Sequence, residues 1–142
     1  INEITKIYKK SIVLNKYINK EIGINIVSSY KRASNILSHE LNNKELEISN
    51  SIDPVLFKSE YEKDLYKKIH ELRKYFTSIN RDENYDLTLK NLADSKKVIF
   101  EFFDNVKVND EDKTIKKNRL ELLHLFCRTF DNYILFSSIE SL

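Results

Sequence analysis

Two groups of basic and polar side chains in the sequence have the composition of a nucleic-acid contact. The first group shares one face of a predicted helix and consists of Ser28, Lys31, Arg32, Asn35 and His39. Cations of this kind bind phosphates, and an amide can read base edges in an exposed single strand. A solvated helix face would have the same composition, so the residues alone leave both interpretations open.

The second group follows an acidic stretch near the C-terminus. Its members are Lys113, Lys116, Lys117 and Arg119, with Asn118 beside them. Phosphate binding and simple solubility are again both compatible with the pattern. For Asn118 and Arg119 a third possibility exists, because such polar side chains near a helix start often bond to neighbouring backbone.

Catalytic and metal-binding patterns are incomplete. His39 and His70 are each followed by Glu, as in a zincin motif, but neither has a second His four residues later. His124 stands alone, and Cys127 lies on an apolar stripe, where a small buried hydrophobe is expected. Gly23 alone cannot form a phosphate-binding loop. We expect no catalytic residues, metal or cofactor in this chain.

Composition favours helices to position these groups. The chain has 142 residues, 41% hydrophobic and 32% charged, with one Gly and one Pro. This is the composition of one folded domain with few tight turns. No apolar run approaches the roughly 20 residues of a membrane span. We therefore predict a single helical domain over 1–142, with an internal loop over 42–53 and no association with a membrane.

Apolar periodicity predicts an all-α bundle of about five helices. Their expected ranges are 2–20, 24–41, 59–79, 85–104 and from 110–112 to 133, with Gly23 as a break before the second. The pattern Ser59-x-x-Glu62 is a capping box for the third helix. Asp53-Pro54 is expected to open a short turn. Val106-Lys107-Val108 is expected to be an extended connector rather than a strand.

The last two helices carry broad apolar stripes. On the fourth helix, inward-facing positions are predicted at Leu89, Leu92, Ile99 and Phe103. The fifth helix has two adjacent stripes, made by Leu120, Leu123, Cys127 and Phe130 and by Ile115, Leu122 and Phe126. So wide an apolar surface predicts that the fifth helix is the central one.

The chain contains one Cys and no Met, even at position 1. The missing Met predicts that this is a piece of a longer polypeptide, whose active site would then lie outside it. A single Cys excludes an internal disulfide and favours a reducing, cytoplasmic setting.

Three blocks of sequence resemble a known family. They are YKRASNIL (30–37), DPVLF (53–57) followed by Glu60, Glu62 and Leu65, and FFDNVKVN (102–109) followed by Asp112 and NRLELL (118–123). In this order they are similar to the C-terminal end of the bacterial glycyl-tRNA synthetase β subunit. That region is an all-helical, DALR-type anticodon-binding domain. The chain departs from the family at Val98, where a Pro is frequent, and at Phe100, where an acid is frequent.

The resemblance implies a role in tRNA recognition. Lys31 and Arg32, helped by Lys116 and Lys117, would neutralise anticodon-stem phosphates, while Asn35 and an exposed aromatic would contact unpaired bases. For Asn118 and Arg119, structural bracing and RNA contact both remain open. The domain would support ATP-dependent attachment of glycine to tRNA without catalysing it.

The resemblance also implies partners and a setting. Family members form a cytoplasmic α/β heterotetramer, in which the α subunit activates glycine with ATP and magnesium and the β subunit engages the tRNA. One alternative is the equivalent domain of an arginyl-tRNA synthetase. A second alternative is a non-catalytic protein–protein interaction module, with an exposed apolar patch from Tyr8, Tyr17 or Phe136.

Overall fold

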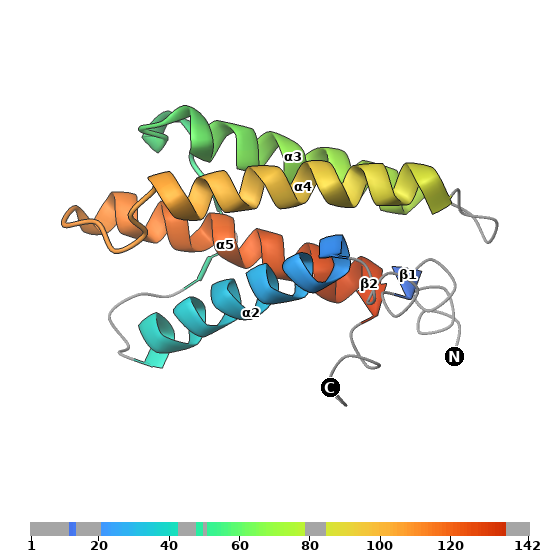
Figure 1. The fold of residues 1–142 in the computed structure, drawn as a ribbon. Helices are drawn as coiled ribbons and strands as arrows, with labels where there is room; N and C mark the ends of the chain where they lie inside the picture. Colours follow the sequence, from blue (N-terminus) through green and yellow to red (C-terminus); the bar gives the residue numbers. More distant parts are fainter. Residues whose placement is uncertain (1–11, 14–20, 43–47, 50, 79–84, 136–142) are drawn as a thin grey trace.

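A computed structural model of the chain describes residues 12–13, 21–42, 48–49, 51–78 and 85–135 (Figure 1). Within these residues lie four α-helices: α2 (Glu21–Asn42), α3 (Glu60–Ser78), α4 (Tyr85–Asn105) and α5 (Lys113–Tyr133). A 3-10 turn, η2 (Pro54–Leu56), precedes α3. The prediction of an all-α bundle is confirmed. None of the described helices is long and apolar enough to cross a membrane.

A small parallel pairing of two strands joins the two ends of the described chain. β1 (Ile12–Val13) pairs with β2 (Ile134–Leu135), with Ile12 opposite Ile134. The helix predicted over 2–20 is therefore wrong at these two residues. β-branched residues suit a strand, and the pairing gives their backbone groups partners from the other end of the chain. The rest of that predicted helix lies outside the described residues.

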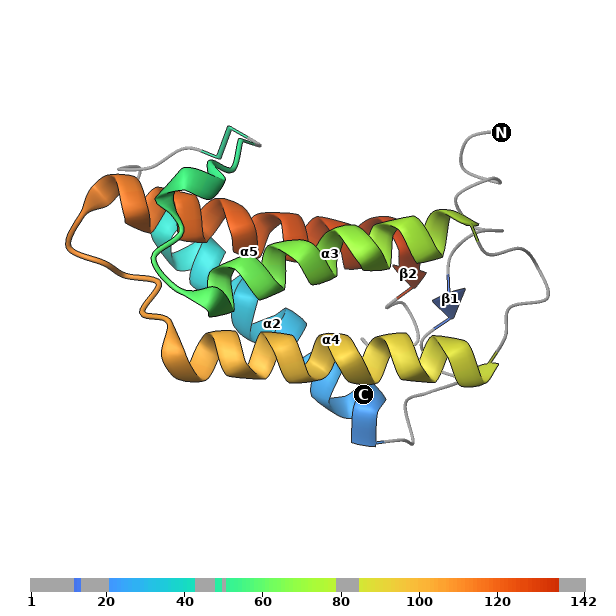
Figure 2. The same cartoon turned by 90° about the horizontal axis from the view of Figure 1, so that it is seen from above.

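The four helices form a bundle in which each helix packs against two of the others. α2 contacts α4 and α5, and α3 contacts the same two helices. The order around the bundle is therefore α2, α4, α3, α5. Figures 1 and 2 show this arrangement from two directions. The face between α2 and α4 consequently lies on the opposite side of the bundle from the face between α3 and α5.

α5 has the most extensively buried surface of these helices, as its two apolar stripes predict. Six consecutive side chains, 118–123, are buried. Further along the helix, the rings of Phe126 and Phe130 lie 4.8 Å apart and are almost completely inaccessible to solvent. Each large apolar side chain buried in this way contributes roughly 1.5–3 kcal/mol to stability.

α4 is rotated slightly from the predicted orientation. Leu92 and Ile99 are buried as expected, but Leu89 and Phe103 are only half-buried. Phe102 is fully buried in place of Phe103. The reason lies in the connector, because Val106 is buried one turn beyond Phe102 and continues its stripe. Phe103 is thereby left at the edge of the bundle.

Local signals set the starts of η2 and α3. Ser59 Oγ accepts from the Glu62 amide at 3.4 Å, and Glu62 Oε1 accepts from the Lys58 amide at 3.2 Å. Asp53 accepts from the Val55 amide at 3.0 Å and opens η2, as its pairing with Pro54 predicts.

Gly23, expected as a break, lies inside α2. One Gly costs a helix only about 1 kcal/mol relative to Ala, so it does not by itself end one.

Candidate nucleic-acid interface

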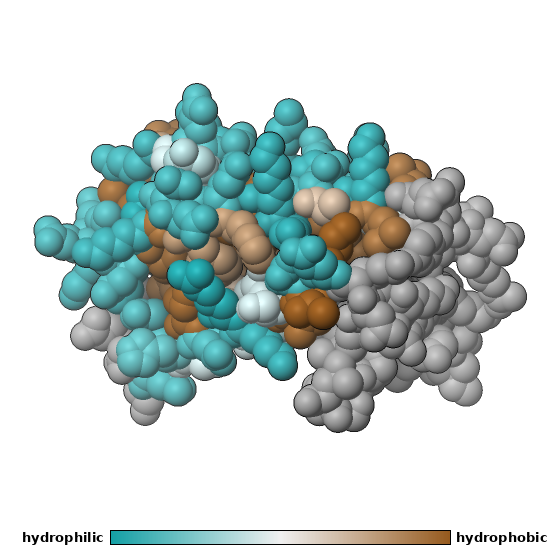
Figure 3. Space-filling view, viewed as in Figure 1, coloured by the Kyte–Doolittle hydropathy of each residue, from teal (hydrophilic) through white to brown (hydrophobic). Residues whose placement is uncertain are grey.

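A groove runs between the second half of α2 and the segment that leaves α4. Its lining residues are Arg32, Asn35, Ile36, His39, Glu40, Phe103, Val106, Lys107, Val108 and Asn109. Figure 3 looks onto this face and shows apolar surface between α4 and α2, bordered by hydrophilic residues. The volume of about 480 Å³ falls in the roughly 300–1,000 Å³ range of small-ligand sites.

Arg32 and Phe103 form the most specific contact at the groove. The guanidinium carbon of Arg32 lies 4.2 Å from the centroid of the Phe103 ring. Such a cation–π contact is worth about 0.5–1 kcal/mol at an exposed site, and it orients the guanidinium while leaving its N–H groups available. A planar cation stacked on an aromatic ring at the groove edge is a surface on which a nucleobase can also stack.

Exposed polar side chains surround the apolar part of the groove. Asn35 and His39 project from α2, and Lys107 and Asn109 lie on the connector. Phe100 lies on α4 one turn before Phe103 and is exposed. The ammonium of Lys96 lies 5.6 Å from the centroid of its ring. Apolar walls with amides and cations at the rim suit an unpaired base, whose faces are apolar and whose edge forms hydrogen bonds.

The connector wall of the groove is held by Arg119. Its Nη1 donates to the Lys107 carbonyl at 2.6 Å and to Asp110 Oδ2 at 3.3 Å. Its Nη2 donates to Glu62 Oε1 at 3.1 Å. The Glu62 side chain is fully buried and that of Arg119 nearly so. Arg119 therefore braces the groove from behind rather than presenting its charge to solvent.

Asn118 has a similar internal role. Its Oδ1 accepts from the Asp53 amide at 2.8 Å, and its Nδ2 donates to the Asp53 carbonyl at 3.0 Å. The side chain thus pairs with the backbone as a neighbouring strand would, and it ties η2 to α5. The sequence left two roles open for Asn118 and Arg119, structural bracing and RNA contact. Both side chains are buried and hydrogen-bonded within the chain, which corresponds to structural bracing.

None of the three predicted lysines, Lys31, Lys116 and Lys117, lines the groove. Lys31 is exposed on α2 but does not line it. Lys116 Nζ pairs with Glu40 Oε2 at 2.7 Å, each side chain 13% exposed, and so joins α5 to the end of α2. Lys117 is half-buried. Lys116 is connected to the groove only through Glu40, its ion-pair partner, which lines the groove.

Comparison with known protein families shows to which family the chain belongs. A family model described as the DALR anticodon binding domain matches residues 26–136. The chain belongs to this family.

Several proteins similar to this DALR domain are glycine–tRNA ligase beta subunits. That of Rickettsia typhi is 35% identical over 123 residues, which make up 87% of this chain and 18% of the relative. Those of Rickettsia prowazekii and Rickettsia felis are 35% and 36% identical over 118 residues, or 83% of this chain and 17% of each relative. The chain spans less than a fifth of the length of these relatives.

Periodicity alone missed part of the groove of this DALR domain. Phe103 was assigned to the core, and Lys107 and Asn109 were assigned no role. The available signal was the excess of aromatics on α4, where Phe100, Phe102 and Phe103 cannot all face one core. At least one of the three must therefore lie near the surface.

Reactive side chains in the DALR domain are restrained by burial. Cys127 is buried, and burial raises the pKa of its thiol to about 12, with the Asp131 charge adding to the effect. A thiol with this pKa is almost entirely protonated at neutral pH and is a poor nucleophile. Among the described residues, no group of three or more His, Cys, Asp or Glu side chains could hold a metal ion.

Proposed function

We propose that this DALR domain binds the anticodon region of a tRNA through the groove between α2 and α4. The observation that carries the proposal is the Arg32 guanidinium stacked on Phe103 at the edge of an apolar groove. The family to which the chain belongs is described by anticodon binding, and this groove has the chemistry to hold an unpaired base.

In the proposed mechanism, the exposed cations act on phosphates. Arg32 and Lys107 border the groove, and Lys31 is exposed on the same helix as Arg32. Together they would attract the backbone of a single-stranded loop, with a dependence on salt that reflects released counterions. Lys117 would add to this field from the start of α5.

Bases would then be recognised inside the groove. The Arg32 guanidinium, held over the Phe103 ring, provides a stacking surface worth roughly 1–3 kcal/mol for each base stacked. The amides of Asn35 and Asn109 can donate to and accept from a base edge. Asn118 and Arg119 hold the walls in place and make no RNA contact in this proposal.

We assign the domain to a larger glycine–tRNA ligase. The relatives named as its beta subunits support this assignment and favour it over an arginyl-tRNA synthetase. In the whole enzyme, which we place in the cytoplasm as an α/β heterotetramer, the α subunit would activate glycine with ATP and magnesium. The domain described here would contribute recognition of the tRNA, without catalytic residues or a cofactor of its own.

The test compares tRNA affinities of the full-length protein and two charge-matched variants. We expect wild-type protein to bind a glycine tRNA more tightly than the same transcript with a replaced anticodon or an arginine tRNA. Arg32→Gln should weaken binding of the glycine tRNA about tenfold, a loss of roughly 1.4 kcal/mol. Lys63→Gln removes the same charge from an exposed position on α3 and should have little effect.

Two outcomes would count against the proposal. Equal affinities for all three RNAs would mean that the anticodon is not read. Equal affinities of the Arg32 and Lys63 variants would mean that the groove is not the interface. In the latter case a role in protein–protein contact becomes the better interpretation. The aromatic residues Tyr8, Tyr17 and Phe136, predicted for such a contact, lie outside the described residues.

A further inference from the structure

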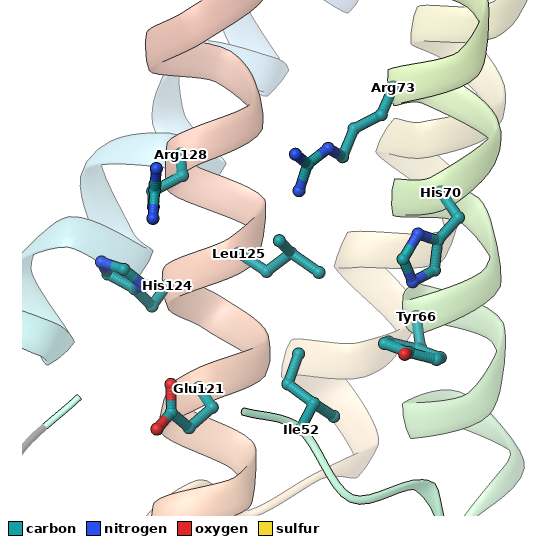
Figure 4. Close-up of a pocket in the computed structure, with 8 residues that line it drawn as sticks. All are labelled: Ile52, Tyr66, His70, Arg73, Glu121, His124, Leu125 and Arg128. Atoms are coloured by element: carbon teal, nitrogen blue, oxygen red, sulfur yellow. The ribbon is translucent and has the colours of Figure 1, made fainter. Parts of the chain in front are cut away.

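A second pocket lies between α3 and α5, on the side of the bundle opposite the α2/α4 groove (Figure 4). It is lined by Ile52, Tyr66, His70, Arg73, Glu121, His124, Leu125 and Arg128. Its volume of about 260 Å³ is below the roughly 300–1,000 Å³ typical of small-molecule sites. Such a volume suits a single small chemical group.

Cationic and hydrogen-bonding side chains from two helices line one end of this pocket. Figure 4 shows Arg73 extending from α3 toward α5, and Arg128 at the same end of the pocket but on the side of α5 away from Arg73. His70 precedes Arg73 by three residues and His124 precedes Arg128 by four, so each imidazole shares a helix face with its arginine. Guanidinium groups match the oxygens of a phosphate in pairs, which a lysine cannot do.

The carboxylate in the lining belongs to Glu121, at the other end of the pocket. It lies two helical turns, roughly 10 Å, from Arg128 along α5. Its Oε2 accepts from the Ser49 amide at 2.7 Å and from Ser49 Oγ at 2.8 Å. Within the described residues, no carboxylate forms an ion pair with Arg73. Among the described residues, the charge of Arg73 is therefore not balanced by an ion pair.

The pKa of His124 is shifted mainly by burial. Burial lowers the pKa of its imidazole, and the charge of Arg128 lowers it further against the opposing effects of Glu121 and Asp131. The lowered pKa favours the neutral form of the imidazole. Opposite it, the rings of His70 and Tyr66 meet edge to face, with centroids 4.5 Å apart, which orients the His70 ring.

We propose that the Arg73 end of this pocket binds a phosphate group, either a phosphodiester of an RNA backbone or a free phosphate compound. Arg73 would bind the phosphate oxygens, while Arg128 and His124, which line the same pocket, would add a positive charge and a hydrogen-bond donor. The inference goes beyond the proposed function, because this pocket and the α2/α4 groove lie on opposite faces of the bundle.

The first experiment titrates inorganic phosphate into the full-length protein by calorimetry at constant ionic strength. We expect saturable binding that weakens at least tenfold in Arg73→Gln and is kept in Lys74→Gln. Lys74 is exposed beside Arg73 on α3 and does not line the pocket, so its variant controls for the loss of one charge. Thermal unfolding of both variants checks that the fold is intact.

The second experiment distinguishes the two phosphate sources. It measures the affinity for a glycine tRNA over a salt series with the same two variants. If the pocket holds an RNA phosphodiester, Arg73→Gln lowers the slope of log K against log salt by about 1 relative to Lys74→Gln. Loss of inorganic phosphate binding with an unchanged slope identifies a free phosphate compound instead.

The two variants also define the result that would overturn the inference. If Arg73→Gln and Lys74→Gln agree in both phosphate binding and the salt slope, the pocket is not a phosphate site. Such a result would leave the α2/α4 groove untouched, because that interface is tested independently by Arg32→Gln against Lys63→Gln.

Discussion

The guanidinium of Arg119 joins α5 to two other segments: the start of α3 at Glu62, and the connector before α5 at Lys107 and Asp110. An ion pair buried in this way adds little net stability compared with apolar side chains of the same volume, because both charges lose their hydration. Its value here is geometric. It holds the wall of the groove that Arg32 and Phe103 border.

Removing Arg119 should therefore be severe. Arg119→Ala leaves the fully buried Glu62 carboxylate without its cation, and we expect a loss of roughly 3–5 kcal/mol in the free energy of unfolding. Urea unfolding followed by circular dichroism measures the change. The control is Lys113→Ala, an exposed substitution on the same helix that should stay within about 0.5 kcal/mol. A loss below about 1 kcal/mol for Arg119→Ala would contradict the bracing role.

At the level of elements, the local structure at the start of α5 fixes the position of the connector that forms one wall of the groove. Asp112 Oδ1 accepts from the Thr114 amide at 2.9 Å and from the Ile115 amide at 3.4 Å. These bonds satisfy amide groups that have no partner within the helix, and the carboxylate suits the positive end of the helix dipole. The same turn places Asp110 against Arg119, so the helix start and the groove wall share one local structure.

The cap has a measurable contribution. Asp112→Ala should lower the free energy of unfolding by about 0.5–2 kcal/mol, because the first turn of α5 loses its acceptor. Glu111→Ala removes the same charge from an exposed neighbour without a role in the cap and serves as the matched control. Equal stability of the two variants in chemical denaturation would show that α5 starts independently of Asp112.

At the scale of the whole molecule, two faces of one bundle are kept rigid by a shared core. α5 contributes the brace behind the groove on one side and Arg128 to the pocket on the other. Leu123 lies between these sites on α5 and is completely buried. The packing of α5 is thus the common support for both candidate sites.

A cavity in this core should destabilise the whole domain. Leu123→Ala is expected to cost about 2–5 kcal/mol in the free energy of unfolding, from lost apolar burial and the cavity left behind. Val55 is 88% exposed, so Val55→Ala should change stability by less than about 0.5 kcal/mol. Thermal and urea unfolding of both variants provide the comparison. A small effect of Leu123→Ala would mean that α5 is not the common support.

Much of the fold could be predicted from local patterns. Apolar positions three and four residues apart specify α2, α3, α4 and α5 because one helix turn brings them onto one face. Asp53, Ser59 and Asp112 mark element starts because their oxygens reach amides two or three residues ahead. The blocks of sequence shared with glycyl-tRNA synthetase β subunits indicated the DALR family without any knowledge of contacts.

The tertiary structure decided which side chains meet, because that depends on which helices are neighbours and how each is rotated about its axis. Periodicity placed Phe103 in the core, yet the burial of Phe102 and Val106 left it at the surface beneath Arg32. Asn118 and Arg119 became internal braces because η2, α3 and the connector come together around the start of α5. Arg73 and Arg128 line one pocket only because α3 packs beside α5.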